Sequence, residues 1–288
     1  MLSGRLGILT DEVSDRYEEA LDWAAEQGLS HVEVRVVDGR NVAALTDEQA
    51  RELRRQAEAR GLFISAVASP VFKCALDPGR PVASGDTFGQ PEESVDAHHE
   101  KLARVIRIAK LLGTHRIRIF SFWRESNPRL YTEEIVGHLR EAARVAAREG
   151  ALLLLENEPS CNGGAAEEVG EYVRLVDSPA LLALWDPGNE AHLGKEAYPS
   201  GYASVQGLVG HVHLKDAYVG HDGRGRCVPL GSGTVKWIPQ LRALAADGYE
   251  GLYTIETHFT PEGGSRKTGT RMTLEALKAI LNEAEEAQ

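Results

Sequence analysis

The sequence predicts one closed barrel of eight parallel strands and eight helices. Short apolar runs alternate with segments of helical periodicity from end to end of the 288 residues, without a break in composition. The segment after the first apolar run, ILTDEVSD, lacks the glycine fingerprint of an open dinucleotide-binding sheet. Parallel strands need helical crossovers, and eight of them can close without edge strands. We expect a single (β/α)8 TIM barrel domain over residues 1–288, with an open doubly wound sheet as the alternative.

Four strand–helix units are expected in the first half of the chain. Each strand is a short apolar run, and each helix repeats apolar residues every three or four positions. Gly28, Gly61 and Gly113 mark helix ends. The expected strands and helices are, in order, 6–9 and 17–26, 31–36 and 47–60, 63–68 and 97–112, and 116–122 and 132–149.

The second half repeats the pattern four more times. The expected pairs are 151–156 and 166–175, 181–185 and 198–206, 211–214 and 235–246, and 252–255 and 268–284. Two connections, 69–96 and 217–234, are long and rich in glycine and proline. Long connections without secondary structure inside a compact domain are usually lids or binding loops, so we expect these two to shape specificity.

Composition excludes several classes of function. The net charge of −11 has the wrong sign for a protein that neutralises nucleic-acid phosphates, so no nucleic-acid partner is expected. No apolar run is long enough to span a membrane, and acidic residues come too early in MLSGRLGILTDE for a signal peptide, which predicts a cytoplasmic protein without membrane contacts. The three cysteines are far apart, as expected for reduced thiols, and a homo-oligomer remains open.

Acidic and imidazole side chains follow or end four consecutive predicted strands. Strand ALLLLENEP ends in Glu156 and Glu158, strand LLALWDPGN in Asp186, strand GHVHLKD carries His211 and His213, and strand LYTIETH ends in Glu256. In a barrel of this kind the active site lies at the carboxyl ends of the strands. These groups are therefore expected to meet at one mouth.

A divalent metal is the simplest explanation for this concentration of carboxylates. Like charges buried together raise one another's pKa values unless a cation neutralises them. Glu156, Asp186, His213 and Glu256 would supply three oxygens and one nitrogen, a set that suits Mn²⁺, Mg²⁺, Co²⁺ or Zn²⁺ without choosing among them. No second full ligand set is present, so one ion is expected. The alternative is that these carboxylates cap helices or pair with Arg and Lys.

The motifs DEVS, HVEVR, FSF, ENEP, WDPGN, HVHLKD, PLGSG and IETH, in this order, resemble the sugar phosphate isomerase/epimerase superfamily of xylose isomerase-like TIM barrels. The resemblance covers essentially the whole chain. It implies a metal held by Glu156, Asp186, His213 and Glu256, with Glu156 and Glu256 also exchanging protons with the substrate. The chemistry agrees, because a chelated 2-hydroxy ketone has an acidified α-proton that a carboxylate can remove and return through an enediolate.

Further residues are candidates for substrate binding. Glu158, Asn189 and Lys215 lie close in sequence to the expected ligands, and Arg224 lies in the glycine-rich connection 217–234. For Glu158 a pairing with a nearby Arg is equally plausible, and for Arg224 a solvated surface charge is the simpler alternative. A second group, Glu33, Arg35 and Arg118, alternates inward on early strands and is expected to form an ion-pair layer under the site. His98 and His99, adjacent on a helix, are expected to be solvated.

The sequence predicts a metal-dependent isomerase or epimerase of a small sugar or keto-sugar. An inosose-type dehydratase is the nearest alternative, because it begins with the same proton abstraction, and a non-catalytic metal-dependent sugar-binding barrel is another. The nuclease branch of the superfamily needs further histidines where this chain has the strand ends ASP (68–70) and FSF (120–122), and another where it has Asn189. The acidic net charge favours a neutral substrate over a phosphorylated one.

Overall fold

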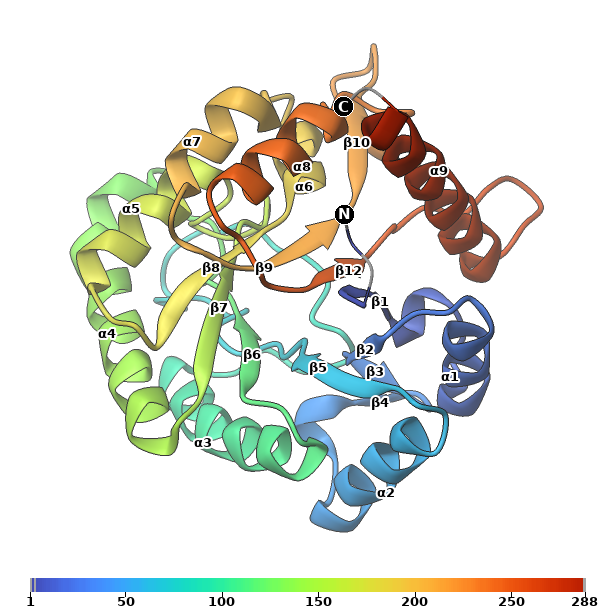
Figure 1. Cartoon of the computed structure of the whole chain (residues 1–288). Coiled ribbons are helices and arrows are strands. Elements are labelled where there is room, and N and C mark those ends of the chain that lie inside the picture. Colours follow the sequence, from blue (N-terminus) through green and yellow to red (C-terminus); the bar gives the residue numbers. More distant parts are fainter. Residues whose placement is uncertain (1, 3, 287–288) are drawn as a thin grey trace.

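Eight short strands pair in parallel and close on themselves in the computed structural model, which describes residues 2 and 4–286 (Figure 1). The order around the barrel is β1, β12, β9, β8, β7, β6, β5 and β2. The strands are β1 (Leu6–Leu9), β2 (His31–Val34), β5 (Phe63–Val67), β6 (Arg116–Ile119), β7 (Leu152–Glu156), β8 (Leu181–Trp185), β9 (Val209–Leu214) and β12 (Tyr253–Ile255). The closed (β/α)8 barrel predicted from the sequence is confirmed.

Helices surround the barrel as an outer ring (Figure 1). They are α1 (Tyr17–Glu26), α2 (Asp47–Glu58), α3 (Val95–Leu112), α4 (Thr132–Glu149), α5 (Ala166–Val176), α6 (Pro187–His192), α7 (Tyr202–Val205), α8 (Trp237–Ala246) and α9 (Arg266–Glu286). Short helical turns cover Thr10–Glu12, Val42–Ala44, Pro128–Tyr131 and Ala197–Gly201.

Local sequence signals explain where several helices begin and end. Thr46 caps α2 by accepting from the Gln49 backbone N–H, and the Gln49 side chain accepts from the Thr46 N–H in return. Ser94 caps α3. Gly113 and Gly150 end α3 and α4 in the left-handed conformation, which glycine adopts without steric cost. These capped helices bury their apolar faces against the strands.

Several expected boundaries are wrong. β6 ends at Ile119, because Phe122 has a φ of 64° and its N–H donates to the Phe72 carbonyl. The expected strand 31–36 divides into β2 and the hairpin of β3 (Val36–Val37) and β4 (Arg40–Asn41). Connection 217–234 is not structureless, because it contains most of the hairpin of β10 (Asp216–Val219) and β11 (Gly225–Val228). The short helix α6 was not expected, and the expected helix 198–206 is a helical turn followed by α7.

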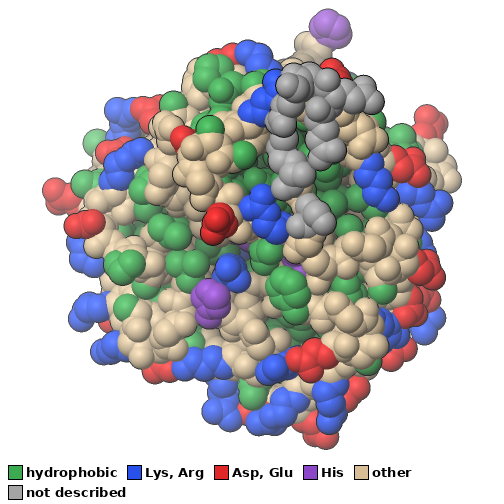
Figure 2. Space-filling view, viewed as in Figure 1, with side chains coloured by type: hydrophobic (Ala, Val, Ile, Leu, Met, Phe, Trp, Pro, Cys, Tyr) green, Lys and Arg blue, Asp and Glu red, His purple; other side chains and the backbone are tan. Residues whose placement is uncertain are grey.

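Charged side chains occupy both the surface and the barrel interior. On the face seen in Figure 2, acidic and basic side chains are interspersed around the edge. Inside the barrel, Glu33, Arg118, His211 and His213 are at most 1% exposed. Among the described residues no helix is long and apolar enough to cross a membrane. The candidate functional residues therefore lie inside the barrel.

Candidate metal centre and active site

The four predicted metal ligands meet at the carboxyl ends of four adjacent strands. Glu156 is the last residue of β7, Asp186 follows β8, His213 lies on β9 and Glu256 follows β12. One ligand atom from each lies within 4.8 Å of the others, and all four side chains are buried. The fold thus brings residues that are 100 positions apart into one ligand-sized cluster.

Asp186 serves two purposes in this cluster. Its Oδ1 accepts from the Asn189 N–H at 2.9 Å and caps α6, which begins with Pro187. Its Oδ2 lies 2.8 Å from Lys215 Nζ but accepts no well-directed hydrogen bond within the described part of the chain. Asp186 therefore shows both of the alternatives considered, because one oxygen caps a helix and the other pairs with Lys215, although Oδ2 accepts no well-directed hydrogen bond within the described residues.

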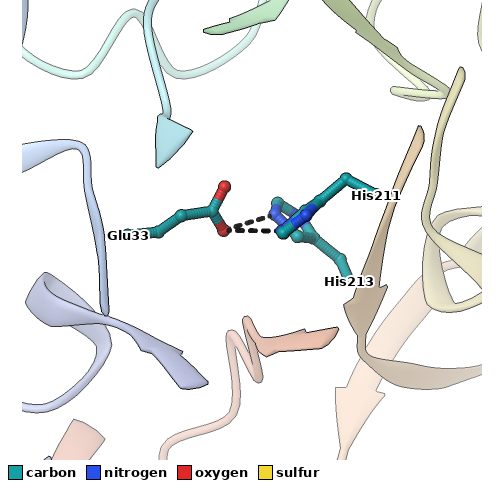
Figure 3. Close-up of side chains that lie close together, drawn as sticks. All are labelled: Glu33, His211 and His213. Atoms are coloured by element: carbon teal, nitrogen blue, oxygen red, sulfur yellow. Dashed lines mark hydrogen bonds and ion pairs between the residues drawn. The ribbon is translucent and has the colours of Figure 1, made fainter. Parts of the chain in front are cut away.

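His213 has different partners at its two ring nitrogens, and Figure 3 shows its contact with Glu33. Its Nδ1 lies 3.0 Å from Glu256 Oε2 and 3.4 Å from Glu156 Oε1. Its Nε2 lies 2.9 Å from Glu33 Oε2, on the opposite side of the ring. Histidine ligands of metals characteristically donate their second ring N–H to a carboxylate. The arrangement leaves Nδ1 as the ligand atom and Glu33 as the group that fixes the ring.

Glu33 Oε2 also lies 3.5 Å from His211 Nε2, so the side chains of Glu33, His211 and His213 converge (Figure 3). Ligand atoms of Glu33, His211 and His213 fall within 4.8 Å of one another. His211 Nε2 also lies 3.0 Å from the Thr254 hydroxyl. This group of three and the group of four predicted ligands both contain His213. The expectation of one ion per chain therefore stays a prediction.

Three buried cations pair with the carboxylates. Lys215 Nζ lies 2.8 Å from Asp186 Oδ2 and 2.9 Å from Glu256 Oε2, between two predicted metal ligands. Arg118 Nη1 lies 3.2 Å from Glu156 Oε2 and 3.4 Å from Glu256 Oε1. Arg35 Nη1 pairs with Glu256 Oε1 at 2.8 Å. Arg35 and Arg118 thus form ion pairs with the predicted metal ligands, whereas Glu33, the third residue of the expected layer, contacts His211 and His213 instead.

Arg35 reaches a further acidic pair. Its Nε lies 2.9 Å from Asp11 Oδ2 and its Nη2 3.0 Å from Glu12 Oε1, in the helical turn after β1. The buried carboxylates thus outnumber the three fixed cations Arg35, Arg118 and Lys215 by two to one. The carboxylates are Asp11, Glu12, Glu33, Glu156, Asp186 and Glu256.

This donor set fits a divalent cation. Glu156 Oε2, like Asp186 Oδ2, is buried and accepts no well-directed hydrogen bond from the described residues, although Arg118 lies nearby. Buried carboxylates in such excess are stabilised when a cation supplies the missing positive charge. Three carboxylates and one imidazole match the oxygen and nitrogen ligands of Mg²⁺, Mn²⁺, Co²⁺ and Zn²⁺.

The neighbouring charges determine the protonation of the cluster. Burial opposes the ionisation of Glu256, but Lys215 and His213 hold the pKa of that carboxyl well below its usual range. Burial, aided by Glu156 and Glu256, raises the pKa of Asp186 in spite of Lys215. Although burial acts against the charged lysine, the carboxylates raise the pKa of Lys215 well above its usual range. Lys215 is thus a permanent cation between two of the predicted metal ligands.

The predicted substrate-binding residues lie at different places relative to the cluster of predicted metal ligands. Lys215 lies inside the cluster, and Asn189 Oδ1 accepts from its Nζ at 3.1 Å. Glu158 lies two residues beyond Glu156 with a partly exposed side chain. Arg224 is exposed in the turn between β10 and β11, and the structure does not bring it to the cluster.

Sequence reasoning missed three residues at the mouth. Asp11 and Glu12 directly follow β1, so the rule that site residues follow barrel strands could have found them. Lys73 lies in the segment after β5 and is only 5% exposed. Its signal in the sequence is a lone charge within the otherwise apolar run PVFKCAL. His98 was expected in solvent but is buried, and its Nδ1 accepts from the Phe72 N–H at 2.8 Å.

The molecule is a (β/α)8 barrel with a candidate metal centre. This centre consists of three buried carboxylates and one imidazole at the carboxyl ends of adjacent strands. The chain belongs to the xylose isomerase-like TIM barrel family, whose model matches residues 21–280. A search of curated protein sequences found no match.

Solved structures share the fold over nearly the whole chain. The D-psicose 3-epimerase from Clostridium cellulolyticum, solved with D-tagatose, is 17% identical with a TM-score of 0.68 and covers 98% of each chain. The probable 3-DHS dehydratase of petrobactin synthesis from Bacillus anthracis is 17% identical with a TM-score of 0.71, covering 95% of this chain and 98% of its own. A xylose isomerase-like TIM barrel protein from Mycobacterium smegmatis, in complex with magnesium, is 19% identical with a TM-score of 0.69, covering 93% and 89%. At these identities the likeness shows the shared fold.

Proposed function

We propose that this protein is a metal-dependent isomerase or epimerase that acts on a small sugar or keto-sugar by proton exchange through an enediolate. The observation that carries the proposal is the convergence of Glu156, Asp186, His213 and Glu256 at one mouth, with ligand atoms within 4.8 Å of one another. The epimerase among the similar structures supports the reaction class, and the magnesium complex supports a divalent ion.

The bound metal would polarise adjacent oxygens of the substrate and so acidify the proton on the carbon beside the carbonyl. Glu156 and Glu256 remove and return that proton as the acid and base pair. The two carboxylates are held unequally. Both oxygens of Glu256 have charged or imidazole partners within 3.0 Å, whereas the closest partner of Glu156 is Arg118 at 3.2 Å. Glu156 is therefore the more available base.

Lys215 and Asn189 act on the same substrate in this proposal. Asp186 and Glu256 would hold the ion, and the Lys215 ammonium, which pairs with both carboxylates in this structure, would then donate to a substrate oxygen instead. Asn189 Oδ1, which lies 3.1 Å from Lys215 Nζ, guides that ammonium. Both side chains are nearly fully buried, so water is a poor competitor for the substrate oxygen.

A dehydratase of the inosose type remains the second candidate. It shares proton abstraction beside a carbonyl but then expels a β-hydroxyl, and the dehydratase among the similar structures supports it. In this reading the base would return the abstracted proton to the leaving hydroxyl, which departs as water, while the Lys215 ammonium would hydrogen-bond that hydroxyl. The two activities differ in mass balance, because isomerisation conserves the atoms of the substrate and dehydration releases water.

The test is incubation of the metal-loaded protein with a panel of ketoses, inososes and hydroxypyruvate in deuterated water. We expect a new isomer that carries deuterium at the exchanged carbon, detected by NMR and mass spectrometry. In Glu156→Gln the rate should fall by about 100- to 10,000-fold, the usual contribution of a general base. The exposed Glu171→Gln is the matched control and should keep full activity. Loss of water identifies the dehydratase, and absence of both exchange and product across the panel contradicts the proposal.

A further inference from the structure

A buried lysine outside the metal-ligand set lies at the mouth of the barrel. Lys73 follows β5, and backbone hydrogen bonds fix the chain on both sides of it. The Phe122 N–H donates to the Phe72 carbonyl at 2.8 Å, and the Trp123 N–H donates to the Cys74 carbonyl at 2.8 Å. The Lys73 residue is 5% exposed. Its ammonium therefore occupies a fixed, nearly dry position.

Aromatic rings surround that ammonium. Lys73 Nζ lies 4.4 Å from the ring centroid of Phe88, 4.5 Å from that of Phe120 and 5.8 Å from that of Trp123. Ring faces within about 6 Å stabilise a cation but accept no conventional hydrogen bond. Across residues 2 and 4–286, no group accepts a hydrogen bond from Nζ, and its closest anion is Glu158 Oε1 at 4.0 Å. An ammonium that is largely enclosed and has no acceptor in the protein gains from a ligand oxygen, which is its natural partner.

Glu158 supplies the complementary acceptor. Its Oε1 accepts from the Ser160 hydroxyl at 2.7 Å, while within the described residues Oε2 accepts no hydrogen bond. An oxygen about 2.8 Å from both groups would bridge the 4.0 Å between Lys73 and Glu158. Only a group that both accepts and donates can satisfy an ammonium and a carboxylate at once, and a hydroxyl does so.

The same rings connect this pair to the candidate metal centre. The Arg118 guanidinium carbon lies 5.1 Å from the ring centroid of Phe88 and 4.8 Å from that of Phe120. Arg118 in turn pairs with Glu156. The Lys73 and Glu158 pair therefore lies one aromatic layer away from the carbons that Glu156 would deprotonate.

We propose that Lys73 and Glu158 bind a hydroxyl group at the end of a neutral, polyhydroxylated substrate, remote from the carbons that exchange protons. This inference rests on the proposed isomerase or epimerase function and adds its substrate class. The pair carries no net charge, so a neutral sugar replaces their missing hydrogen bonds without adding charge. A phosphate or carboxylate in the same place would contact Lys73 but would add a negative charge beside Glu158, so it fits the pair less well than a hydroxyl does. The half-buried ring of Phe88, which is backed by the fully buried Phe120, gives the apolar face of the sugar a surface to pack on.

The test compares D-psicose, D-fructose and D-tagatose with their 6-deoxy analogues, and D-fructose with D-fructose 6-phosphate. Steady-state kinetics are measured for the metal-loaded wild type, Lys73→Met and Lys73→Arg. Lys110→Met, an exposed lysine on α3, is the matched control. Thermal melting verifies that each variant is folded, and elemental analysis verifies its metal content.

We expect the wild type to prefer the hydroxylated ketose over its deoxy analogue by about 10- to 100-fold in kcat/KM, the worth of a hydrogen bond to a charged group. In Lys73→Met this preference should fall below about threefold, chiefly through KM, and Lys73→Arg should restore part of it. Preference retained in a folded Lys73→Met, or faster turnover of the phosphorylated ketose, overturns the inference. If the metal-loaded wild type turns over no ketose at all, the proposed function fails first and this inference falls with it.

Discussion

His98 shows how a single buried side chain makes the stability of the fold depend on pH. Burial lowers the pKa of His98 to about 4, and its Nδ1 accepts from the Phe72 N–H. The folded protein therefore keeps this ring neutral at a pH where the unfolded chain, with an ordinary pKa of about 6.5, takes up a proton. The stabilising contribution is complete above that ordinary pKa and is lost as the pH falls towards 4.

The measurement is the free energy of unfolding in denaturant at pH 7 and pH 5. His98 alone should lower the free energy of unfolding by about 2 kcal/mol over this interval. His98→Asn keeps an acceptor for the Phe72 N–H without a titrating group, so its stability should change less with pH than that of the wild type. An equal pH dependence in the two proteins would show that His98 is not kept neutral.

Replacing Lys215 should change protein stability and metal affinity in opposite directions. Its ammonium lies within 3 Å of Asp186 and Glu256, where a metal would bind, so the two cations compete. Lys215→Met should destabilise the metal-free protein by about 3 to 5 kcal/mol, because breaking a buried ion pair leaves charges uncompensated. It should tighten Mn²⁺ binding by roughly 5- to 150-fold, the usual range of coupling between two sites. Calorimetric titration checks this, and weaker binding would mean that Lys215 helps to hold the ion.

At the scale of elements, a buried aspartate organises the connection after β9. Asp216 Oδ2 accepts from the Gly231 N–H at 2.8 Å and from Trp237 Nε1 at 3.1 Å, and Oδ1 accepts from the Ala217 N–H at 2.9 Å and the Val235 N–H at 3.2 Å. These bonds fix both ends of a connection that looked irregular in the sequence.

Asp216→Ala should lower the free energy of unfolding by about 3 kcal/mol, because it leaves several buried donors without an acceptor. Limited proteolysis should then cut within residues 217–234, a segment that resists cleavage in the wild type. Denaturant unfolding of Asp216→Ala beside Asp222→Ala, an exposed aspartate in the same hairpin, checks the claim. Equal stability of the two variants would contradict it.

The barrel and the cluster of four predicted ligands could be predicted from the sequence because both follow a repeating rule. Each strand is an apolar run, and Glu156, Asp186, His213 and Glu256 each lie near the carboxyl end of a strand or directly after it, so these four could be placed together without coordinates. The β10 and β11 hairpin could not be read, because its pairing depends on contacts that its polar sequence does not reveal. Lys73 was missed for the same reason, because the aromatic rings around it belong to two separate segments that only the fold brings together.

Because the barrel is closed, its first and last strands depend on each other for their hydrogen bonds. β1 pairs with β12, so the first and last strands of the chain complete each other, and no strand edge of the barrel remains free. We propose that residues 1–288 therefore fold as one domain. Tryptophan fluorescence and circular dichroism should report a single shared unfolding midpoint, because Trp23 lies on α1 and Trp237 on α8. Two separate midpoints would show that the chain contains independent units.

The central claim is that the mouth of the barrel holds one divalent ion, and metal content tests it most directly. Protein purified without chelator and dialysed against Mn²⁺ should contain about one ion per chain by elemental analysis. In His213→Ala this content should fall sharply, while His221→Ala, an exposed histidine, should keep it. Full metal content in a folded His213→Ala, or a wild type that binds no ion at all, would contradict the account.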